Sequence, residues 1–469
     1  MSQVSRDVVA SIRVPLSLRQ EEMWDWLERW PQSKNLFNET IRLTLRVKTS
    51  PDLARQVIEY LVERHEPLRT TFRKDELGAY QSIAPSVPVT LSVESLADVR
   101  PEEREAELLR RVSAHDRQPI DVSEGPVFRA TLFEVDDQAS ELVLTVSHII
   151  SDQTTDSILY AEMRAVYEAL VADSTPDLPP LPLQFADYAI WERQWLDDDY
   201  LAGGCRYWCE ALKGMPLDLP LPYDRPKTPD GDKQTRGIDF FVPEDVRDAL
   251  ERLTRETRST FFILVVAAVQ ALLVSATGQT DVVVLTTFHG RDRPELAGVM
   301  GIFAGVGLLR CDLDGDPTFV QVVERARRAV LGMLEHHYVP FDRVVSALID
   351  DLRKEGVEAV PQVPVSVEFF HTTQDGAQAG MLLTEPRPAV EGHVSPGSPG
   401  LYDTINPLAF RLFGGDGLWG RLSYHDAVFD RSTAERFVDD FKLLLAAAAN
   451  DPDLRLSHLR VLGLTSRSV

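Results

Sequence analysis

The sequence predicts an α/β protein built from two lobes, and three observations support this prediction. Helical and strand-like periodicities alternate along the chain in both halves. Proline-rich segments at 175–185 and 216–233 separate these halves, as connectors do. The length of 469 residues leaves room for about two to four domains. We therefore expect an N-terminal lobe over 1–180, a connector over 181–235 and a C-terminal lobe over 236–469.

The first half contains a helix and a strand that leads into a second helix. Apolar residues recur at helical spacing over 53–66, which predicts an amphipathic helix. Residues 141–147 alternate in the way of a strand, and the helical period returns over 157–170. The polar segment SHIISDQTTD between them therefore lies on a strand-to-helix turn, which exposes side chains at a sheet edge.

The second half repeats the order of helix and strand. We expect helices over 243–257 and 260–277, the second closed by Gly278, and then a strand over 282–288. A segment rich in proline and glycine at 386–400 predicts a long mobile or functional loop.

Composition and charge exclude several classes of partner. The chain has 49 basic and 73 acidic residues, a formal net charge of -24, which argues against nucleic acid and anionic membranes as partners. Its most apolar run is shorter than the ~20 residues that span a bilayer, and the N-terminus lacks the apolar stretch of a signal peptide. We expect a cytoplasmic protein with three reduced thiols, of which Cys205 and Cys209 share one helix face.

General catalytic and metal-binding motifs are absent from the sequence. It has no GxSxG elbow, no phosphate-binding loop and no HExxH motif. One GxGxxG match, formed by Gly415, Gly417 and Gly420, lies between two strand-like segments and predicts a hairpin turn. The adjacent His336 and His337 would point in different directions from a helix, so we expect packed or solvated histidines and no metal site.

The histidine in the polar turn has two possible roles, a chemical one and a structural one. Ser147 and His148 are neighbours at a strand end and point to opposite faces, which argues against a Ser-His nucleophile pair. Asp152 follows His148 by four residues, so the turn can hold the imidazole towards a cleft while the carboxylate braces the loop. Taken alone, the same spacing also fits a structural histidine.

Further motifs follow one another along nearly the whole chain. Their strings are LSLRQEEMWDWL, ERHEPLRTTF, FADYAIWERQW, MGIFAGVGLLR and HHYVPFD, with a proline-rich stretch bridging the two halves. Together with the polar turn they resemble the condensation domains of nonribosomal peptide synthetases, a family with the chloramphenicol-acetyltransferase-like fold. The resemblance implies two such lobes that form a V-shaped pseudo-dimer with a central tunnel.

The resemblance also assigns roles to residues of the turn. The family's HHxxxDG motif reads here from Ser147 to Gln153, and its catalytic second histidine corresponds to His148. The family's aspartate is kept as Asp152, where its role is structural, and the matching Gly-Arg position implies that it pairs with Arg291.

Four positions depart from the family pattern. Ser147 replaces the first histidine, Gln153 replaces a glycine beside the channel, and Gly305 with Val306 replaces the usual Asn-Thr. These residues are our candidates for the tunnel and the acceptor side, because Gln153 adds a side chain where the family has none. Fungal terminal condensation domains that cyclise peptides also have a serine at the first position. The non-catalytic recruitment domains of glycopeptide synthetases alter the motif and dock oxygenases.

The resemblance implies a free-standing condensation-type acyltransferase in nonribosomal peptide or hybrid polyketide biosynthesis. Such an enzyme joins an acyl or peptidyl thioester, carried in trans on the phosphopantetheine of a carrier protein, to an amine or hydroxyl acceptor. We expect no cofactor bound by the protein itself, and a monomer. The imidazole of His148, with an ordinary pKa of about 6.5, would orient or deprotonate the acceptor. The alternative is a catalytically silent scaffold that docks a carrier-bound intermediate or recruits a tailoring enzyme.

Overall fold

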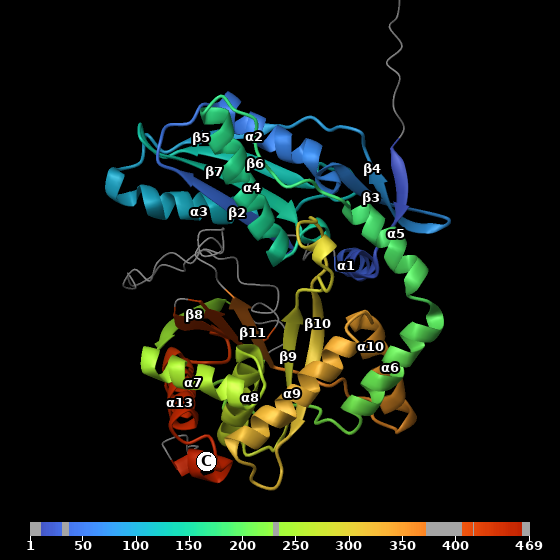
Figure 1. The fold of residues 1–469 in the computed structure, drawn as a ribbon, viewed down its shortest axis with the longest axis vertical. Helices are drawn as coiled ribbons and strands as arrows, with labels where there is room; N and C mark the ends of the chain where they lie inside the picture. The colour runs from blue at the N-terminus through green and yellow to red at the C-terminus, as the bar shows by residue number, and fades with distance from the viewer. Residues whose placement is uncertain (1–10, 31–36, 228–233, 372–405, 416, 462–469) are drawn as a thin grey trace, which may run out of the picture. The chain divides into compact units, whose positions relative to one another are not determined.

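The computed structural model divides the chain into two compact units. It describes residues 11–30, 37–227, 234–371, 406–415 and 417–461 (Figure 1). Within these residues, unit 1 contains the chain up to Asp197 together with His289–Ala304, and unit 2 contains the rest. Both units combine helices with sheets, which confirms the predicted α/β class. The V-shaped arrangement of two lobes stays a prediction.

Unit 1 contains two sheets and five helices among its described residues. One sheet has the strand order β1-β4-β3 and the other the order β2-β7-β6-β5. The strands are β1 (Ile12–Pro15), β2 (Asn38–Leu45), β3 (Thr70–Asp75), β4 (Gly78–Ile83), β5 (Leu91–Ser95), β6 (Phe128–Glu134) and β7 (Ser140–Ser147). The helices are α1 (Leu18–Arg29), α2 (Pro51–Arg64), α3 (Arg104–Asp116), α4 (Gln153–Val171) and α5 (Phe185–Trp195).

The four-stranded sheet of unit 1 forms the support for the polar turn. Every residue of its central strand β7 is buried, which requires cover on both faces of the sheet. On one face, Leu108 and Val112 of α3 pack against Val143 of β7. The strand therefore holds the residues at its end, including His148, against a rigid core.

A buried ionic cluster joins α2 to α4. Glu162 of α4 accepts hydrogen bonds from Nε of Arg64 at 3.1 Å, and its Oε2 lies 2.6 Å from Nε2 of His65. His65 is fully buried, so the contact with Glu162 provides its ring with a polar partner. The string ERHEPLRTTF thus has a structural role that fixes the helix next to the polar turn.

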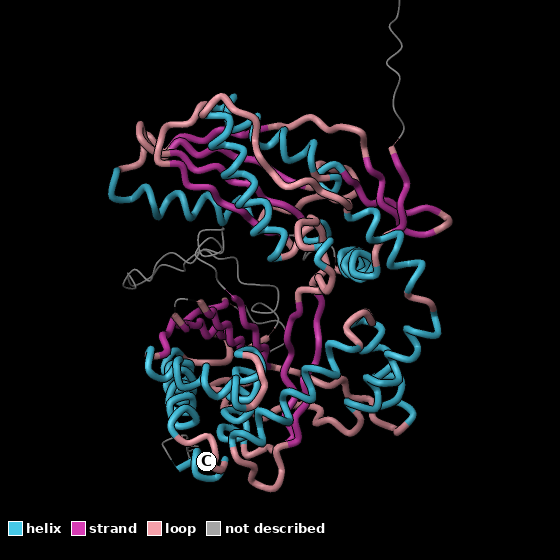
Figure 2. The backbone as a smooth tube through the Cα atoms, viewed as in Figure 1, coloured by secondary structure: helices cyan, strands magenta, loops and turns pink. Residues whose placement is uncertain are grey.

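Unit 2 contains one six-stranded sheet with the order β10-β9-β11-β12-β13-β8 (Figure 2). Its strands are β8 (Thr235–Val242), β9 (Asp281–Phe288), β10 (Gly305–Asp312), β11 (Val365–His371), β12 (Leu408–Gly414) and β13 (Leu418–His425). Its helices are α6 (Asp198–Leu212), α7 (Glu244–Glu256), α8 (Phe261–Thr277), α9 (Phe319–Glu335), α10 (Phe341–Lys354), α13 (Arg431–Asn450) and α14 (Leu456–Val461).

Helix α8 lies in the core of unit 2. Its residues from Ile263 to Val274 are all buried, including Gln270, whose amide donates to the carbonyl of Leu309 at 3.0 Å. Gly278 ends the helix with a φ of 75°, a left-handed conformation that favours glycine. The apolar run of the sequence is therefore a core helix, as predicted.

The element boundaries differ from the predictions in two places, each for a local reason. Helix α2 ends at Arg64 instead of 66, because His65 is extended and Pro67 follows closely. Helix α4 begins at Gln153 instead of 157, because the side chain of Asp152 caps it by accepting from the Thr155 amide. The predicted strand over 141–147 and the predicted hairpin around Gly417 are confirmed.

The division of the chain also differs from the expected lobes. Helix α5 belongs to unit 1 and α6 to unit 2, and the connector over 181–235 stays a prediction. The amide of Leu18 donates to Glu192 of α5 at 2.6 Å, which anchors α5 in unit 1. Residues His289–Ala304, expected in the C-terminal lobe, belong to unit 1. The predicted loop at 386–400 lies outside the described residues.

No single helix in the described part of the chain has both the length and the apolar character needed to cross a bilayer. Helices α7 and α8 pass that test of length and composition only as a pair, and they meet at an angle of 106°. The cytoplasmic location stays a prediction.

Candidate functional site

His148 lies at the end of β7, where the chain turns into α4. A single 3-10 turn, His148–Ile150, follows the strand, and Asp152 then caps the helix. The backbone N–H of His148 donates to the carbonyl of Phe37 at 2.7 Å, which ties the turn to the start of β2. The backbone around His148 is therefore held by β7, β2 and α4. The side chain of His148 remains 22% exposed.

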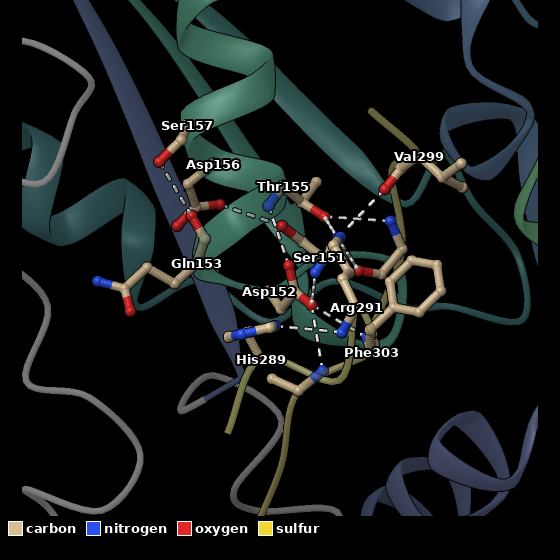
Figure 3. A network of polar contacts seen from close by, with 12 residues as sticks. Ser151, Asp152, Gln153, Thr155, Asp156, Ser157, His289, Arg291, Val299 and Phe303 are labelled. Atoms are coloured by element: carbon tan, nitrogen blue, oxygen red, sulfur yellow. Dashed lines mark hydrogen bonds and ion pairs between the residues drawn. The ribbon is translucent and has the colours of Figure 1, made fainter. Parts of the chain in front are cut away.

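The carboxylate of Asp152 is buried and has several hydrogen-bond donors (Figure 3). Its Oδ1 accepts from the amide of Thr155 at 2.9 Å. Its Oδ2 accepts from Nη1 of Arg291 at 2.6 Å and from the amides of Phe303 and Ala304 at 3.0 and 3.2 Å. The expected pair between Asp152 and Arg291 is thus present, and it joins α4 to the segment His289–Ala304 within unit 1.

Arg291 reaches Asp152 because of a glycine before it. Gly290 has a φ of 63°, and a Cβ at this position would collide with the carbonyl of Phe303. The guanidinium lies over the ring of Phe303, 4.3 Å from its centroid, and also donates to the carbonyls of Val299 and Gly301. Glycine is required here for both its conformation and its lack of a side chain.

Thr155 completes this buried network. Its Oγ1 accepts from the amide of Gly301 at 3.1 Å and donates to the carbonyl of Gly301 at 3.0 Å. Phe303 packs against Phe185 and Tyr188 of α5, with ring centroids 4.9 and 4.7 Å apart. The segment after β9 is therefore fixed to unit 1 by charge, hydrogen bonds and aromatic packing together.

These contacts determine the charge of Asp152. Burial opposes ionisation of its carboxyl, but the charge and hydrogen bond of Arg291 outweigh it, with help from the Thr155 and Phe303 amides. The pKa of Asp152 therefore lies below its ordinary value, and the group is ionised at neutral pH. Asp152 is a brace for the turn and is not available as an acid or base.

A second acidic side chain contacts His148, and the sequence did not point to it. Oε1 of Glu39, on β2, lies 2.7 Å from Nδ1 of His148. Burial opposes protonation of the imidazole, but Coulombic attraction to Glu39 and a hydrogen bond with it outweigh burial. The pKa of His148 is therefore above its ordinary value. The pairing was not foreseen because Glu39 and His148 are far apart in sequence and meet only through the register of β2 with β7.

A second acid lies in the first turn of α4. Asp156 accepts a hydrogen bond from Oγ of Ser151 at 3.1 Å. Burial and the charge of Glu39 raise the pKa of Asp156 well above its ordinary value. The site thus contains one acid in contact with the imidazole and a second acid whose pKa is raised.

The four departures from the family motif separate into two pairs. Ser147 is the last residue of β7, where it is buried, and Gln153 is the first residue of α4. Gly305 and Val306 are the first residues of β10 in unit 2, where Val306 lines a small cavity with Trp208. Ser147 and Gln153 are therefore neighbours of His148 along one turn. The tunnel role of all four residues stays a prediction.

Other histidines and the cysteines have local surroundings of their own. No group of three or more metal-ligating side chains occurs among the described residues, and His336 stacks on Tyr207 at 3.9 Å. The three cysteines are unpaired. Burial raises the pKa of Cys209 to about 11 and that of Cys311 to about 12, so these thiols stay protonated at neutral pH.

Comparisons with known proteins identify the family of this chain. A family model described as Condensation domain matches residues 11–467. One of the linear gramicidin synthase proteins of Brevibacillus parabrevis is 32% identical over 477 residues, which cover 100% of this chain and 9% of that protein. The chain therefore spans less than a tenth of the length of this relative.

Two solved structures have a similar fold over nearly the whole chain. The X-domain from teicoplanin biosynthesis is 26% identical, has a TM-score of 0.75, and the match covers 95% of this chain and 97% of that one. The complex of the X-domain and OxyB from teicoplanin biosynthesis gives 25% identity and a TM-score of 0.76, with 97% of each chain covered.

Proposed function

Because the chain belongs to the condensation domain family and so has a condensation-type role in nonribosomal peptide biosynthesis, we propose that it is a catalytically active acyltransferase. It transfers an acyl or peptidyl group from a carrier-bound thioester to an amine or hydroxyl acceptor. The single observation that carries this proposal is the position of His148, which is partly exposed while the turn around it is braced by the buried Asp152–Arg291 pair. A thioester is already activated, so the protein has mainly to hold the two reactants in line and to move one proton.

We also propose how the substrate arrives. The acyl donor is delivered on the phosphopantetheine arm of a carrier protein added as a separate chain, and this protein works as a monomer without a bound cofactor. Size-exclusion chromatography with light scattering during turnover tests the monomer. Turnover with acyl-coenzyme A as readily as with the loaded carrier would contradict carrier delivery.

The experiment loads a carrier protein with its acyl group, adds amine and hydroxyl acceptors, and follows the carrier by intact-protein mass spectrometry. We expect acceptor-dependent unloading by the wild type and a loss of about 10²–10⁴-fold in His148→Ala. The matched control is His458→Ala, which removes an exposed histidine of α14. Unloading that is equally fast in His148→Ala would contradict the proposal.

A second candidate function is a catalytically silent scaffold that docks a carrier-bound intermediate or recruits a tailoring enzyme. Ser147 and Gln153 in the motif favour it, as does the likeness to an X-domain that forms a complex with OxyB. In the same experiment, a loaded carrier that binds but is never unloaded faster than in the protein-free control would favour the scaffold.

A further inference from the structure

The contact between Glu39 and His148 joins two elements that the buried Asp152 network does not link. Glu39 lies next to Asn38, which pairs with Ser147 in the register of β2 with β7. The backbone bond from His148 to Phe37 brings the imidazole beside the same end of β2. The 2.7 Å separation between Nδ1 and Oε1 therefore follows from the geometry of the sheet.

Asp156, in the first turn of α4, is a second acid of this turn. Ser151 donates to its Oδ1 at 3.1 Å. Burial and the charge of Glu39 raise the pKa of Asp156, because a second negative charge nearby is unfavourable. His148 holds the pKa of Glu39 below its ordinary value even though burial opposes this.

The other charges around the imidazole are accounted for. Glu39 faces it from β2, and Asp152 acts on it from the N-cap of α4. The charge of Asp152 is paired with that of Arg291. Glu39 is therefore the acid whose charge acts most directly on His148.

We propose that Glu39 is a positioning residue for His148 and that its carboxylate pairs with the Nδ1 side of the imidazole and so presents Nε2 to the acceptor. This inference rests on the proposed acyl transfer. In that reaction the acceptor nitrogen or oxygen bonds to the thioester carbon and its proton moves to Nε2. The carbon–sulfur bond breaks, and the leaving thiolate takes the proton from Nε2. Glu39 balances the positive charge that the imidazole carries between these two proton transfers.

The first test measures the pKa of His148 itself in the full chain. Histidine-selective ¹⁵N NMR follows the ring through a pH titration, with His148→Gln as the assignment variant. We expect Glu39→Gln to lower the pKa of His148 by about one unit or more, because an opposite charge in contact is removed. Asp156→Asn should lower that pKa by less than Glu39→Gln does, because Glu39 is the acid whose carboxylate lies 2.7 Å from the imidazole.

The matched control is Glu94→Gln, which removes an acid that lies 2.6 Å from a different histidine of unit 1, His115. It should change neither the pKa of His148 nor the rate of carrier unloading. An unchanged pKa of His148 in Glu39→Gln would overturn the role of Glu39. A pKa of His148 that falls more in Asp156→Asn than in Glu39→Gln would overturn it as well.

The second test uses carrier unloading as a function of pH. A base with a lower pKa stays deprotonated to lower pH, so the acid limb of kcat should move to lower pH in Glu39→Gln while KM for the loaded carrier stays constant. The loss in kcat should be smaller than that of His148→Ala. Glu39→Asp keeps the negative charge, so the pKa of His148 should be higher in this variant than in Glu39→Gln. Glu39→Asp also replaces Glu39→Gln in the comparison if Glu39→Gln does not fold.

The two tests separate the inference from the function on which it rests. If wild type unloads the carrier and the pKa of His148 is the same in Glu39→Gln as in wild type, only the positioning role of Glu39 is wrong. If the titration follows Glu39 but wild type never unloads the carrier, the proposed function is wrong, and the catalytic part of this inference with it.

Discussion

Two ionic clusters lie on either side of one turn and behave differently. The Asp152–Arg291 cluster is almost fully buried, with side-chain exposures of 1% and 4%, and both groups are permanently charged. The Glu39–His148 pair is partly exposed, and Asp156 near it has a raised pKa. The first cluster holds the backbone of the turn in place, and the second contains the histidine that we propose transfers a proton. The difference in burial between them therefore matches a structural role for one and a chemical role for the other.

The largest expected effect tests the structural cluster. Arg291→Ala leaves Asp152 buried without its counter-charge, which should cost about 3–5 kcal/mol of unit 1 stability. Native-state hydrogen exchange of the α4 amides measures this, because it reports on unit 1 alone and does not require the whole chain to unfold in one step.

The control for Arg291→Ala is Lys48→Ala, which breaks a pair of exposed residues. Lys48 and Asp137 are 3.6 Å apart with exposures of 52% and 98%. Such a change usually stays within about 0.5 kcal/mol. Similar exchange rates in the two variants would show that the buried pair does not brace the turn.

The next effect concerns the glycine that lets Arg291 reach Asp152. Gly290→Ala should cost more than about 2 kcal/mol, because it adds a collision with the Phe303 carbonyl to the strain of a positive φ. Gly78→Ala in the β3–β4 hairpin of the same unit has open space around its Cβ and should cost about 1 kcal/mol. Thermal unfolding and hydrogen exchange of the α4 amides compare the stabilities of the two variants. Equal losses of stability would contradict the close approach of Gly290 to the Phe303 carbonyl.

The third effect has the opposite sign. Asp156 has a raised pKa, so the folded protein binds a proton that the unfolded chain has lost, and this acid destabilises the fold increasingly as pH rises above about 4. Asp156→Asn removes that penalty, because the amide carries no charge. We expect a gain of about 0.5–2 kcal/mol at pH 7 that disappears near pH 4. Exchange measured at both pH values checks this, and a less stable variant at pH 7 would mean that Asp156 is ionised.

The smallest effect is the contribution of the Glu39–His148 pair to stability. The pKa of Glu39 is lowered, so its contribution is present above its ordinary range near 4.5 and is lost as pH falls through the lowered value. The pKa of His148 is raised, so its contribution is complete below about 6.5 and is lost as pH rises through the raised value. Wild type should therefore exceed Glu39→Gln most between pH 5 and 6, by about 1 kcal/mol or less. A difference that does not vary between pH 5 and 9 would contradict this pairing.

The sequence by itself determined the α/β class, the strand and helix around the polar turn, and the pairing of Asp152 with Arg291. Periodicity and capping are local properties, so β7, α4 and the core helix α8 follow from residues that are close in the chain. The Asp152–Arg291 pair followed from the order of family motifs and not from spacing, since 139 residues separate the partners.

The tertiary structure alone decided which acids surround His148 and to which unit the segment His289–Ala304 belongs. Strand register brings Glu39 to the imidazole, and an acidic residue in a strand gives no sign of its partner until that register is known. The raised pKa of Asp156 has the same origin, because it depends on burial and on a neighbouring charge that only folding brings near.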